Sequence, residues 1–152
     1  MFHYKKIIEL PMSIDQVFKF STDIYNICEM VPDYIKVKVL EGSDSLVSGD
    51  KVKLKLNILG ISFTWESVVE DYVENEYFSD RMLKGPFKSW EHKHYYKEIA
   101  GGTEQTDIVN YELPLGGIGY LANTFIASKM IEDIFTFRRD FFMAKHAKGC
   151  KI

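Results

Sequence analysis

The segment that could carry chemistry is residues 90–96, which contains two of the four histidines of the chain. In an extended strand, successive side chains point to opposite faces, so Trp90, His92, His94 and Tyr96 share one face. The residues between them are more charged. We therefore expect the histidine-bearing face to point into the protein.

Two aspartates, Asp80 and Asp107, lie on the segments before and after residues 90–96. Alternation places Asp80 on one face with Phe78, and Asp107 on one face with Tyr111. If these faces also point inward, Asp80, His92 and Asp107 meet in one cavity. A carboxylate beside an imidazole fixes the tautomer of the ring and raises its pKa, which suits His92 and Asp107 to acid/base catalysis at a carbonyl or enol. The same residues can equally form a structural polar network, because buried polar groups are paired whether or not they catalyse.

Besides catalysis and a structural network, His92 and His94 could bind a metal ion, since they lie two residues apart on one strand face. Zinc requires a third and a fourth ligand in compatible geometry. Asp80 or Asp107 could serve, but no cysteine or further histidine lies nearby in the sequence. We therefore predict no metal site, and the sequence indicates no cofactor.

Arg138 lies within the apolar arc of the last helical segment, whereas Arg139 lies on the polar side. An unpaired buried charge is very costly, so Arg138 needs a partner. Asp80 or Asp107 would give a structural ion pair. Alternatively, the guanidinium group binds a carboxylate of a ligand, for which its shape is well suited.

The elements that must position these residues are mostly strands. Seven segments have strand character, and six of them follow one another with short connections, which predicts an antiparallel sheet. Two short helices are expected after the first strand, because Ser13 and Gln16 form a capping box and Pro32 ends the second helix. The expected strands are residues 4–10, 35–40, 51–56, 63–73, 77–84, 88–99 and 103–113.

The last segment, from about Ile118 to Ala147, lacks proline and repeats apolar residues at helical spacing. Its apolar arc is wider than a surface helix needs, and the sheet is the one large partner that could cover it. The sequence therefore predicts an α+β fold in which a seven-stranded antiparallel sheet curls around a long C-terminal helix. We expect residues 1–152 to form one domain. The apolar face of the helix is expected to comprise Ile126, Met130, Ile131, Ile134, Phe135, Phe137, Phe141 and Phe142.

Composition narrows the function classes. Aromatic residues make up 14% of the chain, which suggests a large core or a lined cavity. The net charge of −3 argues against nucleic acid as a partner. Two cysteines make no disulfide framework, so we expect a reducing, cytoplasmic location, with Cys28 buried. No run is long and apolar enough for an integral membrane segment, which leaves peripheral contact with a membrane open.

Several segments resemble the START-like superfamily (SRPBCC, the birch-pollen-allergen or helix-grip fold). These are the opening Leu10-Pro-Met-Ser-Ile-Asp-Gln-Val-Phe-Lys-Phe, the segment Asp23-Ile-Tyr-Asn with Val31-Pro32, and the stretches that begin at Gly85-Pro-Phe and Asp107-Ile-Val. The last two look like a subgroup described as polyketide cyclase/dehydrase-like. The resemblance implies the helix-grip fold and ligand binding. It names no reaction, since this fold hosts unrelated functions.

Three functions remain open. The first is binding or carriage of a small hydrophobic ligand, such as a lipid, an isoprenoid or quinone, or a polyketide-like molecule, in an internal cavity. The second is an enzyme of the cyclase, dehydratase or isomerase kind with His92 and Asp107 as acid and base. The third is a protein-interaction module without a ligand, whose interior would be filled by side chains; the chain could be a monomer or a homodimer. The expected ligand-binding residues are Trp65, Phe78, Asp80, Trp90, His92, His94, Tyr111, Phe135 and Arg138.

Overall fold

The computed structural model describes residues 1–114 and 126–148. Within these ranges, seven strands, two short helical segments and one long helix follow one another. They are β1 (Phe2–Leu10), α1 (Ile14–Thr22), the 3-10 helix η1 (Ile24–Glu29), β2 (Ile35–Glu41), β3 (Lys51–Ile58), β4 (Ile61–Val73), β5 (Tyr77–Lys84), β6 (Ser89–Ile99), β7 (Gly102–Glu112) and α3 (Ser128–Ala147).

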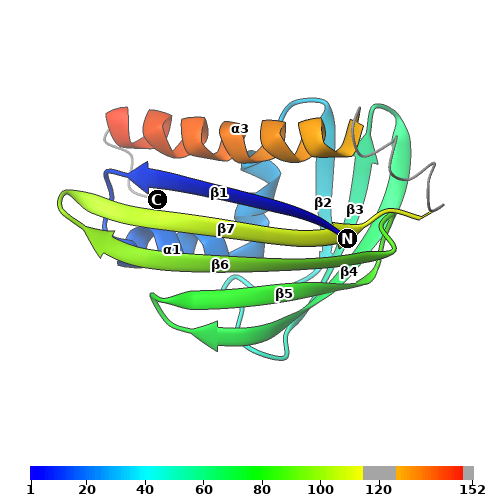
Figure 1. The fold of residues 1–152 in the computed structure, drawn as a ribbon, viewed down its shortest axis with the longest axis horizontal. Helices are drawn as coiled ribbons and strands as arrows, with labels where there is room; N and C mark the ends of the chain where they lie inside the picture. The colour runs from blue at the N-terminus through cyan, green and yellow to red at the C-terminus, as the bar shows by residue number, and fades with distance from the viewer. Residues whose placement is uncertain (115–125, 149–152) are drawn as a thin grey trace.

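The seven strands form one antiparallel sheet in the order β1-β7-β6-β5-β4-β3-β2. Every neighbouring pair except β1 and β7 is consecutive in the chain, as expected for a meander closed by its first strand. Figure 1 shows that β2, β3 and β4 turn away from the direction of β5–β7 and rise toward α3. Register shifts in β4, where it pairs with β5, accompany this bend, since bulges increase local twist. The sheet therefore curls around α3, as the sequence predicts.

Local sequence explains the connections. Ser13 caps α1 by accepting from the backbone N–H of Gln16, and the Gln16 side chain accepts from the backbone N–H of Ser13, which completes the predicted capping box. Leu59 and Gly60 join β3 to β4 with φ values of 51° and 90°. Two consecutive positive φ angles make a tight hairpin turn, and only glycine adopts such an angle without steric cost.

The long helix lies along the sheet beside β1 (Figure 1). Glu132 links α3 to β1. Its carboxylate accepts a hydrogen bond from the Tyr4 hydroxyl at 2.5 Å and pairs with Lys6 at 2.5 Å. The buried residues of α3 are Ile131, Phe135 and Phe142, which were expected to widen the apolar arc, whereas Met130, Ile134, Phe137 and Phe141, expected at its centre, are half-buried. Ile126 differs from the expectation because it is 66% exposed.

The packed interior consists of separate clusters rather than one continuous core. At one end of the sheet, Phe18 of α1 makes edge contacts with Phe78 and Tyr96 and packs with Phe142. Further clusters lie between β7 and α3 and under the curl of β3 and β4. This separation leaves space between α3 and the middle of the sheet.

One further expectation differs from the structure, and another concerns residues that the structure does not describe. Cys28 is exposed, contrary to the expectation that it is buried, because η1 has no buried residue and presents this side chain to solvent. The expected start of the long helix at Ile118 lies outside the described residues, and within them α3 begins at Ser128.

Candidate ligand-binding site

A cavity of about 580 Å³ lies between α3 and the concave face of the sheet. This volume is typical of pockets for small organic ligands. The hypothesis of a ligand-free interaction module requires an interior filled by side chains. The cavity shows that the interior is not filled in this way. Apolar residues of η1, β2–β4 and α3 make up most of the wall, among them Ile24, Ile27, Met30, Val52, Leu54, Leu56, Val69, Met130, Ile131, Ile134 and Phe142.

Six of the nine side chains predicted to bind a ligand line this cavity: Trp65, Asp80, Trp90, His92, His94 and Arg138. The structure places the other three in packed clusters. Phe78 is covered by α1, and Tyr111 and Phe135 pack together between β7 and α3. Strand and helix periodicity predicts which face a residue takes, but not which part of that face another element covers.

An aromatic group forms one end of the wall. The Trp65 ring meets the edges of Trp90 and Phe87 at centroid distances of 5.4 Å and 6.1 Å. Such edge-to-face contacts hold large rings in fixed orientations. This end offers a rigid apolar surface to a ligand.

A polar cluster lies on β5, β6 and β7 and forms another part of the wall. In the sheet register, His92 is opposite Asp80, and His94 is opposite Asp107. Asp107 is 1% exposed and does not line the cavity, whereas the two histidines and Asp80 do. The predicted meeting of Asp80, His92 and Asp107 therefore occurs, with Asp107 behind the histidines.

One oxygen of Asp107 contacts both imidazoles. Nε2 of His92 is hydrogen-bonded to Oδ1 of Asp107 at 2.9 Å, and Nδ1 of His94 lies 2.9 Å from that oxygen, a close contact without hydrogen-bond geometry. The amide of Gln105 donates to Oδ2 of Asp107 at 2.9 Å. Each histidine thus directs one ring nitrogen at Asp107 and leaves the other for the cavity side.

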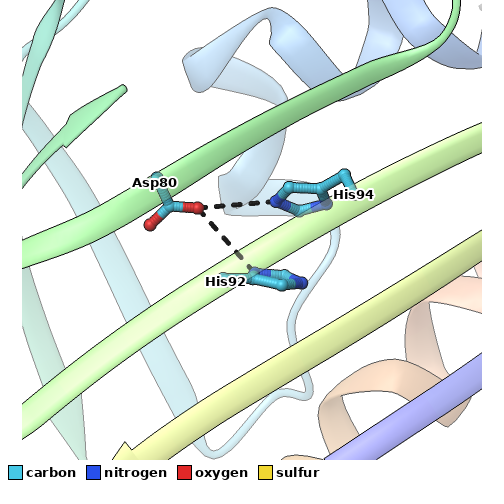
Figure 2. Close-up of side chains that lie close together, drawn as sticks. All are labelled: Asp80, His92 and His94. Carbon is cyan, nitrogen blue, oxygen red and sulfur yellow. Dashed lines mark hydrogen bonds and ion pairs between the residues drawn. The ribbon is translucent and has the colours of Figure 1, made fainter. Parts of the chain in front are cut away.

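The cavity-side nitrogens approach Asp80. Nε2 of His94 lies 3.4 Å, and Nδ1 of His92 lies 3.9 Å, from Oδ2 of Asp80. Figure 2 shows the carboxylate of Asp80 between the strands and facing both rings. Packing fixes the rings: His94 stacks on Phe78 at 4.0 Å, and His92 meets the edge of Phe135 at 5.4 Å.

The electrostatics follow from burial and these contacts. Burial opposes ionisation of Asp107, but the hydrogen bond with His92 and the contact with His94 outweigh it and hold the pKa of Asp107 well below its usual range. Burial, together with the charge of His94, lowers the pKa of His92 and outweighs the carboxylates, so the expected rise of this pKa is wrong. Burial acts in the same direction on His94, but Asp107 and Asp80 outweigh it and raise the pKa of His94. Adjacent imidazoles thus have pKa values shifted in opposite directions.

Arg138 reaches this cluster from α3. It lines the cavity, its guanidinium carbon lies 5.3 Å from the centre of the Phe135 ring, and burial lowers its pKa. The structure gives it no salt bridge with Asp80 or Asp107, so the expected direct ion pair is not formed. Its Nε is buried and has no hydrogen-bond partner among the described residues.

Sequence reasoning missed Gln105. It lies two residues before Asp107 on the same face of β7, lines the cavity, and is 4% exposed. Its Oε1 is buried without a hydrogen-bond partner among the described residues. The alternation that identified Asp107 also points to Gln105, so the signal was present in the sequence.

The family model described as "Polyketide cyclase / dehydrase and lipid transport" matches residues 10–135. The chain belongs to this family. The match includes β5, β6 and β7, which carry the polar cluster, and most of the apolar wall. No curated protein sequence is significantly similar to the chain.

Solved structures agree with the fold of this polyketide cyclase/dehydrase family member. Protein CV1439 from Chromobacterium violaceum superposes with a TM-score of 0.75 at 11% identity, over 95% of this chain and 96% of that one. A START superfamily protein from Mycobacterium smegmatis has a TM-score of 0.73 at 17% identity, over 93% and 97%. Ara h 8.0201 has a TM-score of 0.66 at 13% identity, over 94% and 98%. The helix-grip fold predicted from the sequence is thereby confirmed.

The family and the fold support ligand binding, and the cavity supplies a place for it. In the part of the chain that the structure describes, every helix is too short or too polar to cross a membrane.

Proposed function

We propose that the protein binds one small, largely apolar molecule in the cavity between α3 and the sheet. The single observation that supports this most strongly is the cavity itself, about 580 Å³ with a wall made mainly of aliphatic and aromatic side chains. Residues 1–152 would act as one ligand-binding domain. The ligand classes that fit are a lipid, an isoprenoid or quinone, and a polyketide-like molecule.

The polar end of the cavity adds a requirement for the ligand. Nε of Arg138 and Oε1 of Gln105 are buried in the wall and lack hydrogen-bond partners among the described residues. Buried polar atoms without partners cost about 1–3 kcal/mol each. A ligand is therefore favoured if its oxygen accepts from Nε of Arg138, and Oε1 of Gln105 calls for a ligand hydroxyl or N–H that donates to it. We therefore propose that the ligand has an apolar body with an oxygen-bearing group, such as a carboxylate or enolate, directed at Arg138.

The test is to fill the cavity from α3. Ile134 lines the cavity, whereas Met143 on the same helix points to solvent. Ile134→Trp places an indole in the space that the ligand would use, and Met143→Trp is the matched control with the same new side chain outside. The probe is dodecanoic acid, titrated by isothermal calorimetry after delipidation of the protein.

We expect dodecanoic acid to bind the wild-type protein and Met143→Trp with similar affinity. Ile134→Trp should bind it about tenfold more weakly or worse, a loss of about 1.4 kcal/mol or more. Circular dichroism and thermal unfolding establish that both variants fold. Equal affinity in both variants, or no saturable binding to the wild-type protein, would refute the proposal.

A second candidate function, catalysis by the cyclase, dehydratase or isomerase type of chemistry, is favoured by one specific observation. His92 lines the cavity, its pKa is lowered, and the buried Asp107 holds its far nitrogen. A neutral imidazole oriented in this way can act as a base. Conversion of a bound polyketide-like substrate that is lost in His92→Gln, with ligand affinity retained, would support an enzyme over a carrier.

A further inference from the structure

The two histidines and Asp80 have a geometry that neither a carrier nor an acid/base pair requires. One side-chain atom of each, from Asp80, His92 and His94, lies within 4.8 Å of the other two. The measured separations from the Asp80 carboxylate are 3.4 Å to His94 and 3.9 Å to His92. Ligands bound tetrahedrally to an ion at about 2.1 Å are roughly 3.4 Å apart. The three groups therefore need only small rotations to share one ion.

The arrangement behind the histidines also suits a metal site. Metal-binding histidines generally direct their second ring nitrogen at a carboxylate or carbonyl, which fixes the tautomer and the ring orientation. Asp107 occupies this position: it is hydrogen-bonded to His92 at 2.9 Å and lies 2.9 Å from Nδ1 of His94, and it is buried and accepts a hydrogen bond from Gln105. The nitrogens left over are those that face Asp80 (Figure 2).

We infer that Asp80, His92 and His94 bind one divalent transition-metal ion of the Zn²⁺ or Fe²⁺ class. Two imidazoles and one carboxylate are the ligand set that such ions prefer, and hard ions such as Mg²⁺ prefer oxygen alone. All three residues line the cavity, so the remaining coordination positions face the space for the ligand. The sequence offered His92 and His94, with Asp80 or Asp107 as a possible further ligand, but no metal site was predicted from it. The sheet register places Asp80 directly opposite His92.

The charges are compatible with this inference. Asp80 and Asp107 carry two negative charges, and Arg138, which experiences attraction from both, carries one positive charge. Metal ligation requires both imidazoles to be neutral. In that state the group is negative by one charge, and a divalent ion makes it positive by one. Such a site would favour an anionic oxygen of a ligand at the open coordination position.

The experiment uses metal alone, so its result does not depend on the proposed ligand. The protein is stripped with a chelator and titrated with Co²⁺, whose visible absorption reports imidazole and carboxylate coordination; Zn²⁺ is then used to displace it. We expect one Co²⁺ per chain. Asp80→Asn should weaken binding at least tenfold, and so should His94→Gln. Asp107→Asn should weaken it about 10–100-fold by misorienting the rings.

The controls separate this cluster from the other metal-binding side chains. The double variant His3→Gln/His146→Gln removes both remaining histidines, and Cys28→Ser removes the exposed thiol. Both should bind Co²⁺ as the wild type does. Because Asp80 is partly exposed, Asp80→Asn should fold even if changes to the buried histidines do not. Absence of stoichiometric binding, or binding that survives in Asp80→Asn, would overturn the inference.

Discussion

Replacing Asp107 by asparagine should destabilise the protein strongly, although the side chain keeps its shape. Asp107 is 1% exposed, and its two oxygens contact His92, His94 and Gln105 at 2.9 Å each. The amide group of asparagine has one oxygen and one donor. Its donor must face either the His92–His94 side or the donating amide of Gln105. The native hydrogen bonds to the carboxylate cannot all be kept without a change of histidine tautomer or amide orientation, and the negative charge is lost.

The size of the effect can be worked from these contacts. A hydrogen bond to a charged group contributes about 1.5–3 kcal/mol, and removing one member of a buried charged pair costs about 3–5 kcal/mol. No cavity contribution applies, because the two side chains have similar volume. We expect a loss of about 3–5 kcal/mol in the free energy of unfolding. For a domain of this size, that corresponds to a fall in Tm of roughly 6–20 °C.

Urea and thermal unfolding of the metal-free protein near neutral pH, followed by circular dichroism, measure this loss. Asp140→Asn is the control, because Asp140 is an exposed residue of α3 whose one ion-pair partner among the described residues is its neighbour Arg139. It should change stability by less than about 0.5 kcal/mol. A loss below about 1 kcal/mol in Asp107→Asn would refute the buried network as described.

Two further predictions concern Arg138 and Glu132. Arg138→Met should weaken the binding of dodecanoic acid by about 10–150-fold, because a hydrogen bond to a charged group contributes about 1.5–3 kcal/mol. The affinity for dodecanol should stay unchanged. An equal loss for both ligands in calorimetry would show that Arg138 does not contact the carboxylate. The contacts of Glu132 with Lys6 and Tyr4 lower its pKa, so its contribution to stability is present above its unfolded pKa of about 4.3 and is lost as the pH falls through its folded value. Glu132→Gln should therefore be less stable than the wild type at neutral pH, by less than about 1 kcal/mol because the Glu132–Lys6 pair is half-exposed. Urea unfolding should show that the difference in stability narrows toward about pH 3. A difference that stays constant with pH would contradict a stabilising charge on Glu132.

The fold followed from the sequence because its signals were local and periodic. Alternation along residues 88–99 and 103–113 predicted the strands, and their pairing in register brought His94 opposite Asp107. The capping box at Ser13 predicted the start of α1. The wide apolar arc of the last segment indicated that the sheet must cover it, and the resemblance of several segments to the START-like superfamily implied the helix-grip fold.

The composition of the site was harder to predict, because it depends on which elements cover each part of a face. Phe78 points inward as expected, but Phe18 of α1 covers it, so it packs instead of lining the cavity. Arg138 lies on the predicted arc, yet it forms no direct ion pair, because its partner depends on the distance between α3 and the sheet. Periodicity carries no information about that distance.

The central claim is that the cavity between α3 and the sheet holds an apolar ligand with its polar end at Arg138. A crystal structure of the protein saturated with dodecanoic acid tests it most directly. The account predicts continuous density for one molecule against Ile134 and Trp65, with the carboxylate within hydrogen-bonding distance of Arg138. A cavity closed by rearranged side chains, or dodecanoic acid bound only on the outer surface, would contradict it.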